Sequence, residues 1–156
     1  MKKLVIGLLA AGMLTSVVAP AFAAEATNKT VKHRRAYFQV VLSNAGPLFG
    51  MLKGKVDYDA GKAQTFANNL KLLIEMKNGH LWAKGTDNVA LKGQTRALPA
   101  IWAADSDVGA KSKAWKESVV ALAGDAGKGK DAMIAKMKLV GAACSACHKK
   151  YRAKEF

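Results

Sequence analysis

Five residues near the end of the chain, Cys144-Ser145-Ala146-Cys147-His148, have the types and spacing needed for covalent attachment of a haem group. Two thiols three positions apart can each form a thioether with one haem vinyl group, and the histidine that follows can bind the iron. On a helix, positions i, i+3 and i+4 share one face, so Cys144, Cys147 and His148 can all reach one macrocycle. The pattern predicts one haem c, held covalently by the two cysteines, with His148 as the axial iron ligand.

Cys144 and Cys147 are the only cysteines in the chain, and other chemistries also use two cysteines. In an oxidising compartment the pair could form one disulfide, and Cys-x-x-Cys also occurs in thioredoxin-like redox sites. The thioredoxin-like motif normally opens a helix next to a strand, and no strand pattern lies near Cys144. A zinc site would need four ligands, and the histidines are His148, His33 and His80. Because His148 follows Cys147 directly, haem is the favoured interpretation.

The first 23 residues have the pattern of a secretory signal peptide. Two lysines open the segment, an apolar run follows over residues 4–18, and Ala21-Phe22-Ala23 supplies the small residues that signal peptidase recognises. The apolar run is too short for a membrane span. We therefore predict cleavage near Ala23, export to the periplasm, no membrane span, and a single mature domain formed by residues 24–156.

The charge of the chain limits its partners. There are 25 Lys and Arg residues against 11 Asp and Glu residues. Two of the lysines lie in the predicted signal peptide, so the mature chain carries 23 basic and 11 acidic residues and a net charge of +12. The basic residues are scattered, without the arginine-rich arm or aromatic–basic interleaving of nucleic-acid grooves, and we expect no nucleic-acid partner. A basic surface favours encounter with acidic redox partner proteins or with anionic membrane faces.

Four stretches show helical periodicity, and none shows the alternation of a strand. The pattern predicts helices over residues 30–53, 57–79, 105–123 and from 130 to near the end. Gly46-Pro47 should bend the first helix, because proline removes one backbone hydrogen bond. Asp57 or Asp59 can cap the second helix, and Gly79 should end it in a left-handed conformation. Short first and third connections predict an all-α fold, an antiparallel four-helix bundle with a C-terminal covalent haem site.

The last predicted helix and the long connection over residues 80–104 carry the features that would surround a haem. One stripe of the last helix contains the attachment residues together with apolar ones: Met133, Met137, Val140, Cys144, Cys147, His148 and Tyr151. The connection contains four large apolar residues: Trp82, Leu98, Ile101 and Trp102. A loop of this length with this composition should pack over the protein. The attachment site thus belongs to the buried face of the last helix.

With these features together, the sequence resembles cytochrome c′, a family of exported c-type cytochromes that bind haem at one end of a four-helix bundle. The resemblance covers essentially the whole mature chain. All c-type cytochromes share the attachment motif, and its place in the last of four helices makes the match specific. Four further segments carry the resemblance: Val31-Lys32-His33-Arg34, Trp82-Ala83-Lys84-Gly85-Thr86, Pro99-Ala100-Ile101-Trp102 and Tyr151-Arg152.

The resemblance implies a five-coordinate, high-spin iron whose sixth position is open to nitric oxide and carbon monoxide. An apolar side chain of the first helix, here Phe38, would cover that position, where low-spin relatives carry methionine. The resemblance also implies that Arg34 and Arg35 contact the haem edge or its propionates, a role that suits the guanidinium group. Arg152 would lie near the face of the haem that His148 binds. A homodimer formed through the first two helices is a further implication.

Two functions remain in view. One is the binding of nitric oxide and carbon monoxide in the periplasm, and the other is electron transport between exported redox proteins, with the basic surface steering docking. We do not expect an enzyme, because no acid–base pair can be placed above the iron. His33 lies five residues before Phe38 and on a different helical face, which disfavours it as a sixth ligand. His80 stays open as a sixth ligand because it adjoins the long loop.

Overall fold

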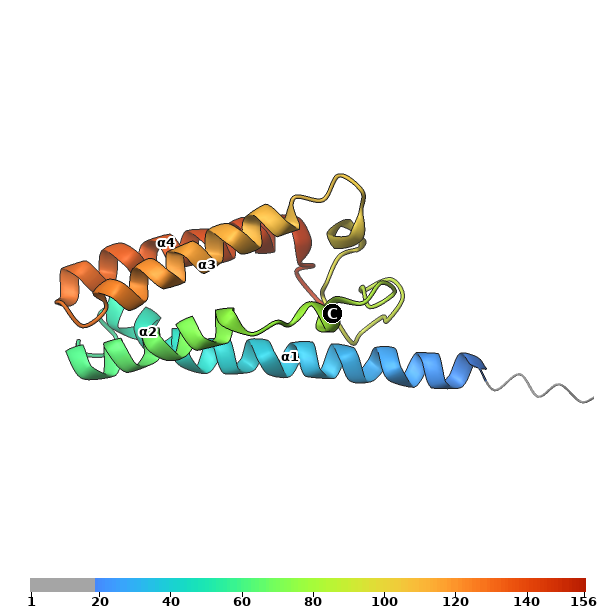
Figure 1. Ribbon diagram of the computed structural model, residues 1–156, viewed down its shortest axis with the longest axis horizontal. Helices are drawn as coiled ribbons and strands as arrows, with labels where there is room; N and C mark the ends of the chain where they lie inside the picture. The colour runs from blue at the N-terminus through green and yellow to red at the C-terminus, as the bar shows by residue number, and fades with distance from the viewer. Residues whose placement is uncertain (1–18) are drawn as a thin grey trace, which may run out of the picture.

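Four helices and two short 3-10 helices make up residues 19–156, the part of the chain that the structure describes; side chains are described from residue 28. The computed structural model in Figure 1 shows neighbouring helices running in opposite directions. The elements are α1 (Ala19–Leu52), α2 (Ala60–Glu75), η1 (Gly79–Trp82), η2 (Pro99–Trp102), α3 (Val108–Asp125) and α4 (Lys130–Tyr151). Each long helix packs against the next, and α4 also packs against α1. The predicted four-helix bundle is confirmed, and no strand occurs within the described range.

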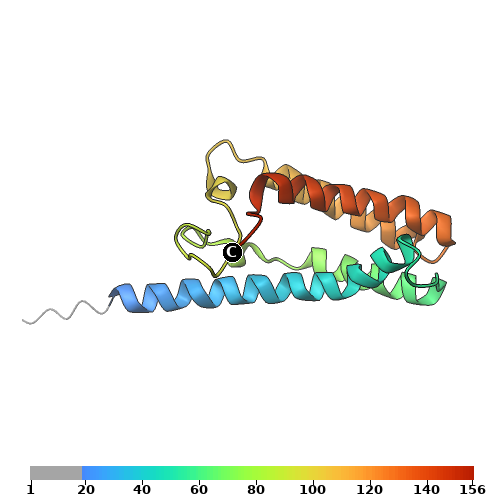
Figure 2. The ribbon, with the colours of Figure 1, turned by 180° about the vertical axis from the view of Figure 1, so that it is seen from behind.

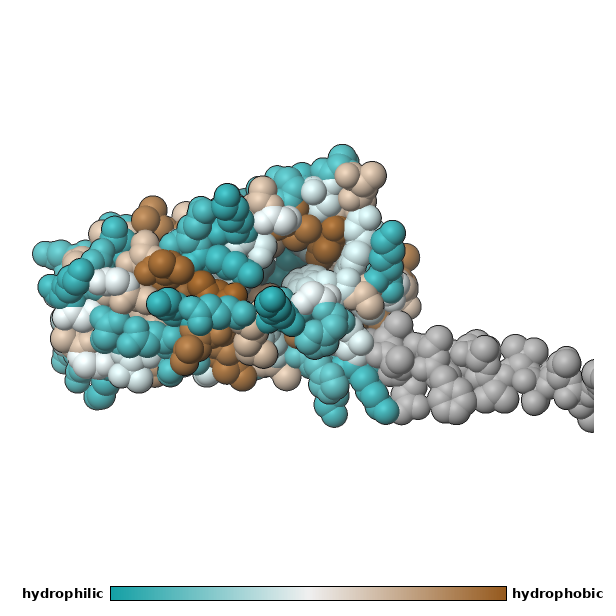
Figure 3. All heavy atoms as spheres, viewed as in Figure 1, coloured by the Kyte–Doolittle hydropathy of each residue, from teal (hydrophilic) through white to brown (hydrophobic). Residues whose placement is uncertain are grey.

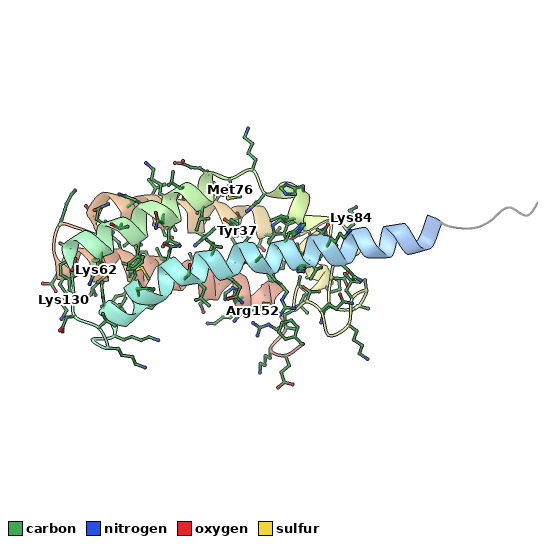
Figure 4. The ribbon with its side chains drawn as sticks, turned by 90° about the horizontal axis from the view of Figure 1, so that it is seen from below. Tyr37, Lys62, Met76, Lys84, Lys130 and Arg152 are labelled. Atoms are coloured by element: carbon green, nitrogen blue, oxygen red, sulfur yellow. The ribbon has the colours of Figure 1, made fainter. Side chains whose placement is uncertain are left out.

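α1 begins earlier than the sequence pattern predicts. We expected its start near residue 30, but the helix runs from Ala19, because the alanine-rich stretch before residue 30 has high helix propensity and its proline, Pro20, lies in the first turn, where proline is tolerated. The predicted cleavage site near Ala23 falls within these first turns, and residues 1–18 of the predicted signal peptide lie outside the described part. Pro47 lies inside α1, and the ribbon bends over its last turns, as expected (Figure 4).

The start of α2 agrees with the sequence, but its end does not. Asp59 is the capping residue, and its carboxylate accepts a hydrogen bond from the backbone N–H of Lys62 at 2.8 Å. The helix ends at Glu75, and Gly79 does not adopt the predicted left-handed conformation but opens η1. A long-range contact supports this end of the helix: Tyr37 of α1 donates its hydroxyl proton to the carbonyl of Leu73 at 3.0 Å, and so satisfies a carbonyl in the last turn.

A continuous apolar core fills one half of the bundle, at the end where α1 meets α2 and α3 meets α4 (Figure 1). Its largest fully buried side chains come from all four helices and are 0–1% exposed: Leu48, Met51, Leu70, Val119, Leu122, Met133 and Met137. Met133 and Met137, which the sequence pattern placed on the buried stripe of the last helix, are both 0% exposed, and that prediction is confirmed. None of the helices in residues 19–156 is long and apolar enough to cross a membrane.

The long connection between α2 and α3 packs against the rest of the molecule, as predicted. Leu81 and Ile101, one from each short 3-10 helix, are buried. Beyond α4 the chain pairs with this loop: the N–H of Leu98 donates to the carbonyl of Tyr151 at 3.0 Å, and the N–H of Ala153 donates to the carbonyl of Arg96 at 2.8 Å. Figures 1 and 2 both show the end of α4 and the chain terminus beside the loop. The loop and the tail therefore support the part of α4 that carries the attachment motif.

Candidate haem site

The attachment motif lies in the last two turns of α4. Cys144, Cys147 and His148 are all half-buried, and both thiols are free, so the disulfide alternative is not formed. Cys144 packs against the apolar core, which places the motif at the border of that core. Within residues 19–156 no group of three or more His, Cys, Asp or Glu side chains could hold a metal ion, so no zinc site of that kind is formed there.

The protonation states of the motif fit haem attachment. Burial raises the pKa of the Cys144 thiol, and the neighbouring Cys147 raises it further. Burial also raises the pKa of Cys147. Burial lowers the pKa of His148, and the positive charges of Arg152 and Arg96 lower it further, so the imidazole stays neutral and keeps a lone pair for a metal ion. Two thiols that can form thioethers with the haem vinyl groups and a neutral imidazole that can bind the iron lie on one helix face, as a covalently bound haem requires.

Phe38 lies on α1 with 40% of its surface exposed. Its ring meets the rings of Tyr37 and Trp82 edge to face, with centroids 5.1 and 6.1 Å away. Trp102 continues this aromatic group and donates its indole N–H to the carbonyl of Trp82 at 2.8 Å. Phe38 is thus held from one side and leaves an apolar face uncovered, which suits a site that an apolar macrocycle would cover. That Phe38 faces the iron stays a prediction.

Arg34 is buried, with 4% of its surface exposed, and its hydrogen bonds hold the long loop between α2 and α3 against α1. Its Nη1 donates to the carbonyl of Leu81 (3.2 Å) and to Oγ1 of Thr86 (2.8 Å). Its Nη2 donates to the carbonyl of Thr86 (2.6 Å) and to Oγ1 of Thr95 (3.0 Å). Burial lowers the pKa of Arg34, although not enough to neutralise a guanidinium. Four of its five N–H donors are used, so the predicted propionate contact would have to come from Nε–H.

Helical periodicity could not predict the Arg34 network, because its partners lie 47 to 61 residues away along the chain. Thr86 and Thr95 are both buried, and their hydroxyl groups complete the cage around the guanidinium. The guanidinium carbon also lies 4.9 Å from the ring centroid of Trp82, which in turn contacts Phe38. Arg34 therefore positions the aromatic group that holds Phe38, a role additional to the predicted one.

Arg35 and Arg152, the other predicted haem-edge residues, are both exposed. Arg35 donates from Nη1 to the carbonyl of Gln94 at 3.2 Å. Nη1 of Arg152 lies 3.5 Å from Nε2 of His148, one turn earlier on α4, so the structure does bring Arg152 next to the predicted iron ligand. His33 and His80 are exposed on α1 and η1. The predicted contacts of Arg35 and Arg152 with haem stay predictions.

A four-helix bundle with Cys-x-x-Cys-His on its last helix defines a class, the helical-bundle c-type cytochromes. A family model described as Cytochrome C′ matches residues 29–152, and the chain belongs to this family. It is 37% identical to the cytochrome c′ of Cereibacter sphaeroides over 146 residues, which cover 94% of this chain and 97% of the relative. The solved cytochrome c′ from Rhodobacter Spheriodes superposes with a TM-score of 0.80 at 36% identity, covering 83% of this chain and 98% of that one. The family binds haem c covalently, and the two cysteines stand in the expected C-terminal helix.

Similar solved structures include gas complexes. Two variants of the Alcaligenes xylosoxidans cytochrome c′, a ferrous one with bound nitric oxide and one with bound carbon monoxide, have TM-scores of 0.70 and 0.69 at 27% and 28% identity. They cover 83% and 82% of this chain, and 97% of each is matched. Another cytochrome c′, with a TM-score of 0.73, 28% identity and coverage of 82% and 97%, is described as having an unusual ligand-controlled dimer dissociation.

Proposed function

We propose that this protein is a periplasmic cytochrome c′ whose haem iron is five-coordinate and high-spin and binds nitric oxide or carbon monoxide beneath Phe38. The observation that carries the proposal is the surroundings of Phe38, whose ring neighbours are Tyr37 and Trp82. Indole does not bind iron. The Tyr37 hydroxyl is committed to the carbonyl of Leu73, and burial raises its pKa, which disfavours the phenolate form that would bind iron.

Other side chains that could supply a sixth ligand lie elsewhere. In the described part of α1 the only methionine is Met51, which is 1% exposed in the apolar core. His33 is exposed and lies on a different face of α1 from Phe38. His80 is exposed in η1, two residues before Trp82. Of the two histidines outside the attachment motif, only His80 therefore stays open as a sixth ligand, and substituting that residue tests it.

A ferrous haem in this site supplies a vacant coordination position for a diatomic ligand. The protein decides what reaches that position. Phe38 offers no hydrogen-bond partner, so a water molecule gains little there, whereas nitric oxide and carbon monoxide are neutral and need none. The ring must turn aside for any ligand, and its contacts with Tyr37 and Trp82 limit how far it can turn. Phe38 therefore selects small, uncharged ligands. The gas complexes of similar cytochromes c′ support this proposal.

The deciding experiment is an absorption spectrum of the reduced holo-protein before and after addition of carbon monoxide and nitric oxide. We expect a broad high-spin spectrum that changes with each gas. A sharp low-spin spectrum that carbon monoxide does not change would contradict the proposal, and the same spectrum of a His80→Ala variant would then identify the hidden ligand.

Phe38→Met tests the location of the residue. A thioether in place of the ring should bind the iron, so we expect a sharp, low-spin spectrum and a loss of carbon monoxide binding. Phe49→Met, on the same helix but packed against the apolar core, is the matched control and should leave the spectrum high-spin. If both variants keep the wild-type spectrum, Phe38 does not face the iron.

Electron transport is the second candidate, and the basic surface favours it. Lys149 and Lys154 are exposed beside the end of α4, and the predicted mature chain has a net charge of +12. A carrier would exchange electrons with an acidic protein at a rate that falls steeply with salt. A low-spin spectrum in the experiment above would make this the better assignment. We propose no enzymatic role.

We also propose a homodimer formed through α1 and α2. Both helices expose large apolar side chains, Val40 (48%) and Leu42 (58%) on α1 and Leu72 (64%) on α2, and Met76 (50%) follows directly after α2. Figure 3 shows apolar side chains reaching the surface over α2. Leu72→Glu should shift the sedimentation coefficient from that of a dimer to that of a monomer, and Leu139→Glu, on α4, should not. A wild-type protein that sediments as a monomer at micromolar concentration would refute the dimer.

A further inference from the structure

Three arginines from distant parts of the chain meet beside the attachment motif. Arg35 comes from α1, Arg96 from the loop before η2, and Arg152 from the end of α4. The guanidinium carbons of Arg35 and Arg96 lie 4.8 and 5.2 Å from the ring centroid of Phe156, the last residue. Arg152 is placed next to Arg96 because Ala97 and Arg152 form a backbone bridge. We call Arg35, Arg96 and Arg152 the arginine cluster; Figure 4 labels Arg152, far from Lys62 and Lys130 at the other end of the bundle.

Within residues 28–156 the arginine cluster makes no ion pair. The ion pairs in the described part of the chain all involve lysines, and none reaches Arg35, Arg96 or Arg152. The charges are close enough to act on one another: burial lowers the pKa of Arg152, and Arg96 lowers it further. Both arginines also lower the pKa of His148. Grouped cations repel, and the repulsion needs a counter-charge.

Most of the donors in the cluster remain available. Arg35 uses one donor on the carbonyl of Gln94, and Arg96 uses one on the carbonyl of Lys154, each at 3.2 Å. A guanidinium has five N–H donors, so each keeps enough for a bidentate contact with a carboxylate. Arg34, by contrast, has four donors already bound inside the protein. The donor count thus favours the cluster over Arg34 as a carboxylate site.

We propose that Arg96 binds a propionate of the covalently attached haem, with Arg35 as its partner across the ring of Phe156. The inference rests on the proposed haem site, because Cys144, Cys147 and His148 fix the macrocycle beside the cluster. The resemblance to the family implied edge or propionate contacts for Arg34 and Arg35 and a place near the His148 face of the haem for Arg152, and it implied no contact for Arg96. The ring of Phe156 contacts both guanidinium groups and so helps to orient them by cation–π interaction. The tail beyond α4 therefore completes the propionate site.

Arg96→Gln in the holo-protein tests the proposal, and Lys92→Gln, four residues earlier in the same loop, is the matched control for loss of one exposed charge. The readout is the propionate bending band in the resonance Raman spectrum, which responds to hydrogen bonds on the carboxylate. Arg96→Gln should shift this band and lower the reduction potential, because a cation near the iron is lost. Lys92→Gln should leave the band in place. Equal spectra for Arg96→Gln and wild type would overturn the proposal and leave a soluble anion or an acidic protein as the occupant.

Two further variants keep the test decisive if Arg96→Gln disturbs the tail. Arg96→Lys preserves the charge but removes the bidentate contact that a guanidinium can make. The reduction potential should therefore stay near wild type while the Raman band shifts. Phe156→Ala changes no charge and should shift the band in the same direction as Arg96→Gln, by a smaller amount. An unshifted band in both variants would refute the assignment. Carbon monoxide binding should be unchanged in every variant. The Raman band reports on the propionate and not on the gas ligand, so its outcome is independent of whether the gas-binding function is correct.

Discussion

The two ends of the bundle are held together in different ways. At the closed end, defined by the core residues from Ala45 to Ile74 and from Val119 to Val140, apolar side chains from four helices fill the interior completely. At the haem end, defined by the attachment motif, the loop and the tail, the buried groups include Arg34, Thr86 and Thr95. Hydrogen bonds at the periphery hold that end together.

The difference explains how a bundle keeps room for a cofactor. Apolar packing stabilises by filling space, and a fully packed interior would exclude a macrocycle. The hydrogen bonds at the haem end surround the site instead. Those of Arg34 hold the loop against α1, and those of Tyr151 hold the end of α4 against the start of α3. Tyr151 donates its proton to the carboxylate of Asp107, and its oxygen accepts from the backbone N–H of Asp107 (2.9 Å) and the hydroxyl of Ser106 (3.2 Å).

The largest effect should come from the closed end. Met137→Ala removes a side chain that is fully buried in the core, and such truncations cost about 2–5 kcal/mol. Leu139→Ala, two residues away and 53% exposed, should cost less than about 0.5 kcal/mol. Urea unfolding followed by circular dichroism measures both. If Met137→Ala changed the haem spectrum of the folded protein as well as its stability, the two ends would not be independent.

The sequence predicts the closed end well and the haem end only in part. The stripe from Met133 to Tyr151 is local, because a helical period is set by neighbouring residues, and both the motif and the core methionines follow from it. The Arg34 network joins residues 47 to 61 positions apart, and the contact of Tyr151 with Asp107 joins residues 44 positions apart. Such pairings depend on where the loop folds back, and a single sequence has no short-range signal for that.

Tyr151→Phe should have the next largest effect. The phenol hydroxyl binds a carboxylate, and a hydrogen bond to a charged group contributes about 1.5–3 kcal/mol. Tyr58→Phe is the matched control at the closed end: its hydroxyl donates to the carbonyl of Ala126 (2.9 Å) and accepts from the N–H of Gly129 (3.1 Å), both neutral, for which about 0.5–1.5 kcal/mol is expected. Only Tyr151→Phe should also alter the haem spectrum, since His148 lies one turn before it. If both variants lost the same unfolding free energy and kept their spectra, the hydrogen bond of Tyr151 to Asp107 would have no special role at the haem end.

Asp107→Asn should have the smallest effect, and it should depend on pH. Tyr151 and then Lys150 hold the pKa of the exposed Asp107 carboxyl well below its ordinary value. A carboxyl with a lowered pKa in the folded state stabilises the protein above its unfolded pKa of about 3.9, and this stabilisation is lost as the pH falls toward the folded value. The unfolding free energies of wild type and Asp107→Asn should therefore differ by a constant amount between about pH 5 and 8 and converge at lower pH. The control is Asp105→Asn, which removes the same charge two residues earlier; its unfolding free energy should show neither the difference from wild type nor the convergence at low pH. If the unfolding free energies of wild type and Asp107→Asn instead stayed a constant amount apart down to low pH, the contact of Tyr151 with Asp107 would not depend on the charge of the carboxylate.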